Sequence, residues 1–378
     1  MRPRPERLRR LPEQYFTALL ARVAAAAALD GESLVDLGRG NPDVPPPAHV
    51  VEALARAAAR ADAHGYAPFA GLPALKEAIA GRYREVYGVA LDPASEVAVL
   101  AGSKTGLMEF AQITVERAGA IVLPDPGYPD YLSAVALAAA RHVALPLLDD
   151  GRPDWDAAPR DAAALYLNYP SNPVAACAPA GVFDEAVEWA LEADAWVLHD
   201  FAYGDLVFDG RRPSSFLAAH GAREVGLELF SMSKSYGMAG WRLGFAVGNS
   251  ELVARLEALQ SHLFAGVFIP VQEAGVAALT GPQETVEERR ALYEARRARA
   301  LAALQGLDAR AEGTFFVWFR LPPGTTAASL LEEHRVAVAP GEGFGERGRG
   351  WARLSLATPD DRLDLGLERL RNGLRVPR

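Results

Sequence analysis

One short segment combines a lysine, two serines and an arginine at spacings that suit a phosphorylated ligand. It reads Ser231-Met-Ser233-Lys234-Ser-Tyr-Gly-Met-Ala-Gly-Trp-Arg242, with the arginine eight residues after the lysine. Hydroxyls and a permanently charged guanidinium can hold a phosphate. The lysine would lie beside whatever carries that phosphate, and burial and nearby positive charge favour its free amine, which can attack a carbonyl. Phosphate, aldehyde and lysine together predict pyridoxal phosphate as the cofactor.

The scarcity of lysine supports this interpretation. Of the 39 basic residues, three are lysine (Lys76, Lys104 and Lys234) and the remaining 36 are arginine. A lysine amine can lose its proton and act as a nucleophile, whereas arginine stays protonated. Lys76 lies in a helical pattern and is interpreted as solvated, so Lys104 and Lys234 are the candidates for chemistry.

The elements that position these residues alternate between short apolar runs and amphipathic helices from Glu96 to Asn249. This alternation predicts an α/β fold: a three-layer large domain with a mostly parallel seven-stranded sheet. Strands are predicted over Val97–Ala101, Ala120–Leu123, His142–Pro146, Ala164–Asn168, Ala195–Asp200, Gly226–Met232 and Leu243–Gly248. Helices are predicted over Gly106–Ala118, Tyr131–Ala140, Gly181–Ala193 and Ser250–Gln260.

The pattern changes after Gly281 and predicts a second, smaller α+β domain. A long helix is expected near Glu284–Leu304, followed by strands over Thr314–Leu321, Arg335–Ala339 and Trp351–Ala357. We therefore predict an amino-terminal arm that joins the small domain (1–44), a large cofactor-binding domain (45–280) and a carboxyl-terminal small domain (281–378).

Polar residues follow the predicted strands at their carboxyl ends, where open α/β sheets bind ligands. They are Ser103, Lys104, Asp125, Tyr128, Asn168, Asn172, Asp200, Tyr203, Ser231, Ser233 and Lys234. Such convergence from five strand ends predicts a binding site.

Several of these residues suit the predicted cofactor. Asp200 ends a buried run and can keep the pyridine nitrogen protonated, so that the ring accepts carbanion charge. Asn172 and Tyr203 can hydrogen-bond the ring oxygen, and Tyr128 offers an aromatic face for stacking. Ser103 and Lys104 open a helix whose amino-terminal amides favour a phosphate.

The segment around Lys234 resembles the cofactor-lysine motif of fold-type-I, class I/II aminotransferases, which depend on pyridoxal phosphate. The resemblance covers nearly the whole chain. Its other motifs are Leu-Gly-Arg-Gly-Asn-Pro-Asp (37–43), Gly-Tyr-Ala-Pro-Phe-Ala-Gly-Leu-Pro-Ala-Leu-Lys (65–76), Ala-Gly-Ser-Lys-Thr-Gly (101–106), Asn-Tyr-Pro-Ser-Asn-Pro (168–173) and Arg-Leu-Ser-Leu-Ala (353–357). Within the family, the Gly-Ser-Lys-Thr-Gly, His-Asp-Phe-Ala-Tyr-Gly-Asp and 263–281 segments are most similar to the LL-diaminopimelate aminotransferase branch.

The resemblance implies a catalytic role for three residues. Lys234 would form the Schiff base with the cofactor and serve as the base of the 1,3-proton shift once substrate displaces it. Asp200 would pair with the pyridinium, and Tyr203, with Asn172, would contact the ring oxygen while Tyr128 stacks on the ring.

The resemblance also implies how phosphate and substrate are held. The phosphate-binding set is Ser103, Lys104, Ser231, Ser233 and Arg242, with Tyr66 reaching in from a neighbouring subunit of a homodimer with shared active sites. Arg353 would clamp the substrate α-carboxylate, and Gly40, Tyr15 and Asn172 would line the substrate pocket. The partners would be a small-molecule amino acid and a 2-oxo acid, with 2-oxoglutarate expected, in a ping-pong reaction.

Two departures from the family pattern bear on the substrate. Val174-Ala175 replace the frequent Thr-Gly after Asn172-Pro173, and Ala265 stands where the diaminopimelate branch often places an asparagine from the partner subunit. The resemblance implies an LL-diaminopimelate-like donor, and these departures leave aspartate, alanine and aromatic amino acids open.

Three rival functions remain open. A carbon–sulfur β-lyase would use the same cofactor and lysine. Gly343-Phe-Gly345-Glu-Arg-Gly348 formally matches the dinucleotide-binding fingerprint, but a strand rather than a helix is expected to follow it. A regulatory ligand sensor would need a DNA-binding domain, for which the first 33 residues offer no room.

Composition excludes other classes. A net charge of −9 disfavours nucleic-acid binding, and the longest apolar run, Val23 to Leu29, is far short of a membrane span. Cys177 is the only cysteine, which suits a reducing compartment, and no secretory signal pattern is recognised, so the cytoplasm is expected. The seven histidines show no ligand spacing, so no metal is predicted.

Overall fold

A computed structural model of the chain describes residues 4–30 and 33–374. Residues 1–3 and 31–32 of the predicted amino-terminal arm, and 375–378 of the predicted small domain, lie outside the described residues. No helix in the described ranges is both long enough and apolar enough to cross a membrane.

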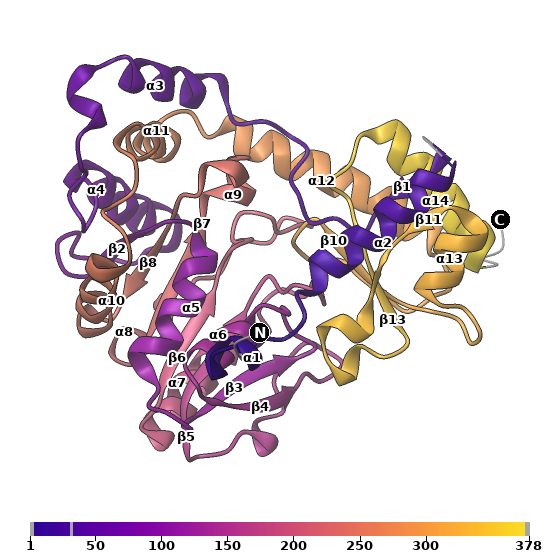
Figure 1. The fold of residues 1–378 in the computed structure, drawn as a ribbon, viewed down its shortest axis with the longest axis horizontal. Helices are drawn as coiled ribbons and strands as arrows, with labels where there is room; N and C mark the ends of the chain where they lie inside the picture. The colour runs from indigo at the N-terminus through magenta and orange to yellow at the C-terminus, as the bar shows by residue number, and fades with distance from the viewer. Residues whose placement is uncertain (1–3, 31–32, 375–378) are drawn as a thin grey trace.

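The centre of the fold is a seven-stranded sheet with the strand order β2-β8-β7-β6-β5-β3-β4 (Figure 1). Its strands are β2 (Val97–Leu100), β3 (Ala120–Asp125), β4 (Arg141–Pro146), β5 (Ala162–Asn168), β6 (Trp196–Asp200), β7 (Gly226–Ser231) and β8 (Gly244–Gly248). Only β8 runs antiparallel to its neighbours, β2 and β7. The prediction of a mostly parallel sheet in an α/β fold is confirmed.

Helices cover both faces of this sheet because side chains alternate along each strand. In β2, Val97 and Val99 enter one apolar cluster and Ala98 and Leu100 enter the other. The first cluster includes residues of α3 (Ala48–Ala58), α4 (Pro73–Arg82), α7 (Val182–Ala193), α8 (Ala222–Val225) and α11 (Ile269–Thr280). The second includes residues of α5 (Ser103–Thr114), α6 (Tyr131–Leu137) and α10 (Ser250–Leu263). These are the three predicted layers.

A second, antiparallel sheet has the order β12-β13-β10-β9. Its strands are β9 (Ala309–Arg310), β10 (Phe316–Arg320), β12 (Ala339–Pro340) and β13 (Trp351–Ser355). Residues of α12 (Glu284–Ala303), α13 (Ala327–His334) and α14 (Asp360–Leu374) share its apolar cluster. The division of the chain after residues 44 and 280 stays a prediction.

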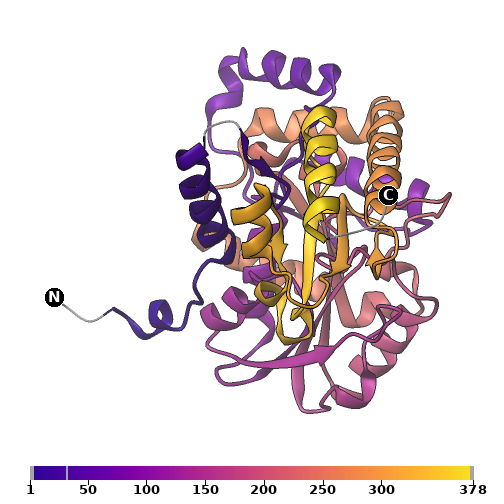
Figure 2. The same ribbon diagram turned by 90° about the vertical axis from the view of Figure 1, so that its right-hand side faces the viewer.

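The amino-terminal segment packs beside this second sheet. After α1 (Glu6–Arg9), α2 (Tyr15–Asp30) lies next to α13, as Figure 2 shows. The two-residue strand β1 (Val35–Asp36) then pairs in parallel with β11 (Val336–Ala337). Residues 38–41, which follow β1, therefore lie between the two sheets.

The single strand predicted over Arg335–Ala339 is wrong in detail. The chain bends at Val338, so that β11 pairs with β1 while β12 pairs with β13 in the other sheet. The neighbours on the two sides of Val338 differ, and an apolar run cannot reveal such a change of partner.

The glycines of the dinucleotide-like fingerprint do not open a helix of ordinary length. Two short turns, Gly341–Phe344 and Glu346–Gly348, lead directly into β13. At Gly345 a Cβ would lie 2.1 Å from Asp125 Oδ1, so this glycine permits close packing between the two parts of the fold. The prediction that a strand follows is confirmed.

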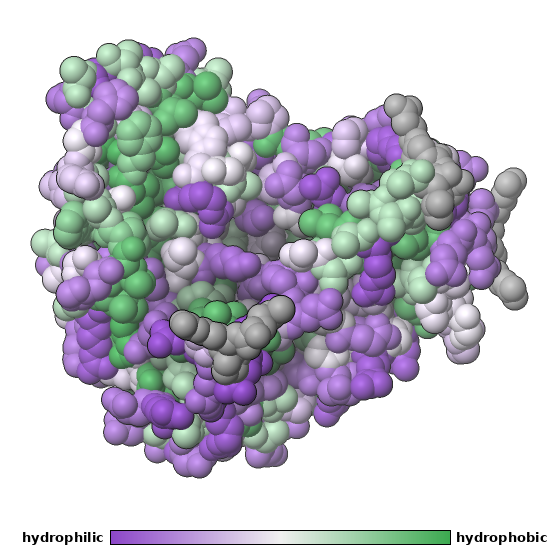
Figure 3. All heavy atoms as spheres, viewed as in Figure 1, coloured by the Kyte–Doolittle hydropathy of each residue, from purple (hydrophilic) through white to green (hydrophobic). Residues whose placement is uncertain are grey.

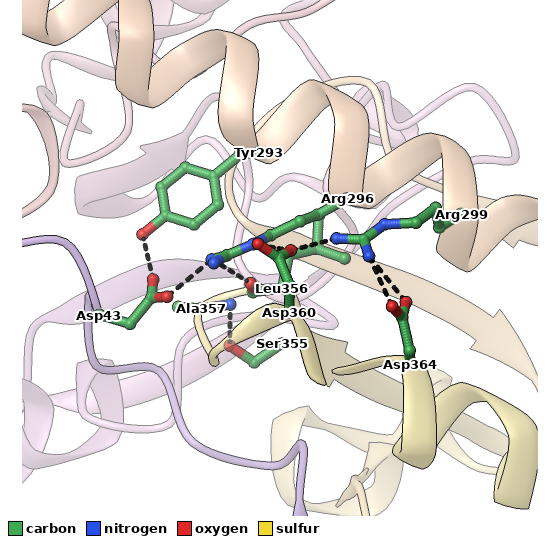
Figure 4. A network of polar contacts seen from close by, with 9 residues as sticks. All are labelled: Asp43, Tyr293, Arg296, Arg299, Ser355, Leu356, Ala357, Asp360 and Asp364. Carbon is green, nitrogen blue, oxygen red and sulfur yellow. Dashed lines mark hydrogen bonds and ion pairs between the residues drawn. The ribbon is translucent and has the colours of Figure 1, made fainter. Parts of the chain in front are cut away.

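A polar network anchors the segment that enters the large sheet region (Figure 4). Asp43 accepts hydrogen bonds from Tyr293 (3.0 Å) and Arg296 (2.7 Å). Arg296 also donates to the carbonyl of Leu356 (3.0 Å) and to Asp360 (3.1 Å). Helix α12 thereby connects Asp43, which follows residues 38–41, to Leu356 and Asp360, which follow β13.

Candidate active site

A cavity of about 320 Å³ lies at the carboxyl ends of the parallel strands, where the two sheets meet. Its polar and charged lining comes from Arg39, Asn41, Ser103, Lys104, Tyr128, Asn168, Asn172, Asp200, Tyr203, Ser231, Ser233, Lys234, Arg242 and Arg353. Its apolar and small lining comes from Phe16, Leu19, Leu20, Gly38, Gly40, Leu107, Ala202 and Phe316. The lining thus holds five cationic side chains against one carboxylate, Asp200. In a chain of net charge −9, this concentration of positive charge suits an anionic ligand.

Lys234 lies on the floor of the cavity, in the four-residue helix α9 (Met232–Ser235) that directly follows β7. The Ser231 hydroxyl begins that helix by accepting a hydrogen bond from the Ser233 amide (3.2 Å). Lys234 Nζ donates to the carbonyl of Gly40 (3.1 Å). Burial, followed by the positive charges of Arg353 and Arg242, lowers the pKa of Lys234 to about 8. About one molecule in ten then carries the free, nucleophilic amine at pH 7.

Asp200 ends β6 and is 5% exposed. Tyr131 donates its hydroxyl hydrogen to one carboxylate oxygen, Oδ2, at 2.8 Å. The other oxygen, Oδ1, is buried and has no hydrogen-bond partner in the described part of the chain. Burial raises the pKa of Asp200, which means that the charged carboxylate favours a cationic partner here. A protonated ring nitrogen is such a partner, so Asp200 fits pyridoxal phosphate.

The end of β7 and the start of α5 bring together groups that can bind a phosphate. Gly102, with φ of +85°, is the residue before that helix, and a Cβ there would lie 2.1 Å from the Arg242 guanidinium. The arginine therefore lies directly against the amino terminus of α5, beside Ser103 and Ser231 in the cavity lining. Within residues 4–30 and 33–374, no carboxylate forms an ion pair with Arg242 that would satisfy its charge. Helix amides, hydroxyls and an arginine together form an anion site.

Arg353 is a buried cation that lacks a counter-ion. It lies in β13, is 1% exposed and donates to Asn172 Oδ1 (2.6 Å) and to the carbonyl of Gly38 (3.1 Å). The ring of Phe316 lies 3.9 Å from the guanidinium carbon. None of the described carboxylates pairs with it, and its Nε is also unpartnered. Burial lowers the pKa of Arg353 to about 10, so it remains charged at neutral pH and favours an anion from outside the chain.

The residues expected to contact the cofactor ring lie around the same cavity. Tyr203 is buried, with its ring edge-to-face against Phe315 at 5.4 Å. The side-chain oxygen of Asn172 accepts a hydrogen bond from Arg353. Its Nδ2 has no partner among the described residues, so it can donate a hydrogen bond to a ligand. Tyr128 is half-buried and packs edge-to-face on Tyr131 at 5.5 Å.

Two expected site residues do not line this cavity. Tyr66 is 89% exposed, and its expected role in the site of a neighbouring subunit stays a prediction. Tyr15 lines a neighbouring cavity instead, because its hydroxyl donates to the carbonyl of Pro340 (2.8 Å) and its ring packs on Phe344. Lys104 does line the main cavity, although its amine is paired with Asp130 at 2.7 Å.

The apolar wall of the cavity was not predicted. Phe16, Leu19 and Leu20 come from α2, and Phe316 comes from β10 of the second sheet. An apolar stripe in the Tyr15–Asp30 helix was the only available signal, and it does not say which surface the helix covers. Arg39 and Asn41 lie inside a motif that was recognised, yet no role was assigned to them.

The chain resembles characterised proteins over nearly its full length. The model of the family described as aminotransferase class I and II matches residues 32–370. The L-glutamine–4-(methylsulfanyl)-2-oxobutanoate aminotransferase of Bacillus subtilis (strain 168) is 44% identical over 94% of this chain and 92% of that protein. The LL-diaminopimelate aminotransferase of Moorella thermoacetica is 39% identical over 97% of both chains. Among solved structures, substrate-bound BacF from Bacillus subtilis superposes with a TM-score of 0.92, at 37% identity over 98% of both chains.

Proposed function

The chain belongs to the class I and II aminotransferases, which depend on pyridoxal phosphate, and from that premise we propose that it transfers the amino group of a neutral amino acid to a 2-oxo acid. The observation that carries the proposal is that Lys234 and the buried, uncompensated Arg353 line the same cavity. The first supplies an amine and the second a site for a carboxylate. An α-amino acid and a 2-oxo acid both carry that carboxylate.

We propose the following roles for the chain's own residues. Asp200 would hold the protonated ring nitrogen through its unpartnered Oδ1, and Asn172 and Tyr203 would donate to the ring oxygen. Ser103, Ser231, Ser233, Lys104 and Arg242 would hold the phosphate. When bound, pyridoxal phosphate supplies an aldehyde that takes up the amino group and a ring that accepts electron density from the substrate's α-carbon. Lys234 Nζ would take the proton from the α-carbon of the amino donor. In the second half of the reaction it would give a proton to the α-carbon of the acceptor.

The apolar wall supports a neutral side chain on the donor. Phe16, Leu19 and Leu20 of α2 face the cavity, and its lining contributes no carboxylate near them, Asp200 being committed to the cofactor. A distal ammonium group, as in LL-diaminopimelate, would find no free counter-charge among the described residues that line the cavity. Methionine- or glutamine-like donors fit this wall better, which agrees with the activity for which the Bacillus subtilis relative is named.

A donor and acceptor screen tests the proposal. Purified enzyme loaded with pyridoxal phosphate should move amino groups from methionine or glutamine to a 2-oxo acid, measured as the new amino acid by chromatography. LL-diaminopimelate and phenylalanine belong in the same screen. No transfer with any pair would overturn the proposal. Pyruvate and ammonia formed from cystathionine without an acceptor would indicate the carbon–sulfur β-lyase instead.

Replacing Arg353 by methionine should separate activity from stability. Loss of hydrogen bonds to a charged carboxylate, worth about 1.5–3 kcal/mol, should lower kcat/KM about 10- to 150-fold, mainly through KM. The thermal midpoint should stay equal or rise, because an uncompensated buried charge is removed. Arg353→Lys, which keeps the charge without the fork, should lie between. Unchanged kcat and KM would exclude Arg353 from the site.

We also propose a homodimer with shared active sites, in the cytoplasm. Of the nine large apolar side chains in the described ranges that are at least 44% exposed, five are Val51, Tyr66, Phe69, Leu263 and Phe268. Apolar surface gathers over α3, α11 and α10, on the left in Figure 3. Exposed aromatic and aliphatic groups in such number favour a protein partner. The single cysteine favours the reducing cytoplasm.

Tyr66→Phe tests the shared site. Sedimentation should give a dimer for the wild type and for the variant, because the ring and its apolar contacts remain. Loss of one hydrogen bond to a phosphate should weaken retention of the cofactor about 10-fold or more, measured by dialysis and absorbance. A monomeric wild type, or unchanged cofactor retention in Tyr66→Phe, would contradict this assignment.

A further inference from the structure

One cation in the cavity has no role in the scheme above. The positively charged lining residues are Arg39, Lys104, Lys234, Arg242 and Arg353. Lys234 donates to Gly40, Lys104 is paired with Asp130, and Arg242 lies at the phosphate site. Arg353 is assigned to the substrate α-carboxylate. Arg39 alone is unassigned.

The position of Arg39 places it beside the reacting groups. The carbonyl of Gly38 accepts a hydrogen bond from Arg353 (3.1 Å), and the carbonyl of Gly40 accepts one from Lys234 (3.1 Å). Arg39 therefore lies between the two residues that contact the substrate-binding arginine and the nucleophilic lysine. The main chain on both sides of it is fixed by charged donors, so the base of its side chain is well positioned.

The charge of Arg39 is uncompensated in the described structure. Its side chain lines the cavity but is exposed, and it forms no hydrogen bond or ion pair with residues of the described ranges. Asp36 interacts electrostatically with Arg39 without forming an ion pair, and its Oδ1 accepts from the amide of Gly38 at 2.9 Å. An arginine that borders this cavity without an ion pair can bind an anionic group of a ligand inside it.

From this placement, and resting on the proposed aminotransferase function, we infer that Arg39 binds the distal carboxylate of a dicarboxylic substrate such as 2-oxoglutarate or glutamate. Arg353 would hold the α-carboxylate of the same molecule. A neutral substrate would use Arg353 in the same way and lay its side chain on Phe16, Leu19 and Leu20. The cavity would thus accept an acidic and a neutral substrate in alternation, with Arg39 engaged only by the first.

The decisive substitution is Arg39→Gln, which removes the charge and keeps a similar length. In the holoenzyme, kcat/KM for 2-oxoglutarate should fall about 10- to 100-fold, while that for 2-oxobutanoate stays within about twofold. Arg39→Lys should recover part of the loss. Arg212→Gln removes an exposed arginine that does not line the cavity, and it should leave both acceptors unchanged.

Binding of unreactive acids gives a second readout. Calorimetry on the holoenzyme should show glutarate binding about 10- to 100-fold more weakly to Arg39→Gln than to the wild type, with pentanoate unchanged. The glutarate affinity of the wild type should also fall with added salt more steeply than the pentanoate affinity.

The outcomes distinguish this inference from the function on which it rests. Equal losses for both acceptors, no loss for either, or a wild type that uses 2-oxobutanoate but not 2-oxoglutarate would overturn the role of Arg39 alone. A wild type that transfers amino groups to no 2-oxo acid would overturn the proposed function as well.

Discussion

Replacing Lys234 by alanine should reduce amino transfer by at least about 10³-fold. Burial and two neighbouring arginines give this lysine a pKa of about 8, and a hydrogen bond to the Gly40 carbonyl holds the amine over the cavity floor. The variant would lose both the nucleophile that binds the cofactor's aldehyde and the base that moves the α-proton. Proton transfer by a positioned base alone is worth about 10²–10⁴-fold. The measurement is kcat under saturating substrates.

Lys76→Ala is the matched control for this prediction. The interpretation of Lys76 as solvated is wrong, because it is 7% exposed and paired with Glu257 at 2.8 Å. It lies on an element that does not line the cavity. Its replacement should leave kcat within about twofold. Borohydride reduction followed by peptide mapping should place the cofactor on Lys234 of the wild type and of Lys76→Ala. Normal turnover by Lys234→Ala would refute the assignment.

Asp200→Asn should lower kcat about 10²- to 10³-fold, the usual cost of removing one positioned electrostatic group. The substitution preserves shape, and an asparagine oxygen can still accept from Tyr131. It removes the charge that would keep the ring nitrogen protonated. Tyr131→Phe leaves that charge in place and should therefore cost much less. Equal rates for wild type and Asp200→Asn would exclude a role for the carboxylate.

Stability should move in the opposite direction for Asp200→Asn. Burial raises the pKa of Asp200 in the folded chain above its unfolded value, so its ionised form destabilises the cofactor-free protein at pH 7. Removing the charge should keep or increase the thermal midpoint of the cofactor-free protein. Adding pyridoxal phosphate should stabilise the wild type more than the variant. A large drop in the cofactor-free midpoint would mean that the residue is mainly structural.

The sequence was most informative where chemistry follows a strand. In a parallel sheet the carboxyl ends of the strands share one edge, so Ser103, Asn168, Asp200 and Ser231 could be grouped without knowing any contact. The structure places all four in one cavity. The strands of the large sheet were found with boundary errors of one or two residues. All but the edge strand β4 form largely buried apolar runs, which are easy to recognise in a sequence.

The remaining parts of the site depend on contacts between distant segments. Helix α2 lies over the cavity because its apolar side chains pack against residues such as Trp318 and Phe344, which are more than 280 positions away in the sequence. Tyr131 was recognised as helical, but its hydrogen bond to Asp200 depends on how α6 sits on the sheet. The apolar periodicity placed the start of α5 at Gly106, whereas the helix begins at Ser103, as the expected anion site at Ser103 and Lys104 required. Gly102, before that start, adopts a positive φ that no pattern in the apolar residues reveals.

The exposure of the three lysines has a practical consequence. Lys76 is enclosed and paired, and Lys234 lies on the cavity floor, whereas the Lys104 side chain is 48% exposed at the cavity rim. Among side-chain amines, an amine-directed dye of moderate size would therefore couple at Lys104. Because Lys104 would also hold the phosphate, bound cofactor should slow this coupling, so the labelling rate would report whether the site is filled.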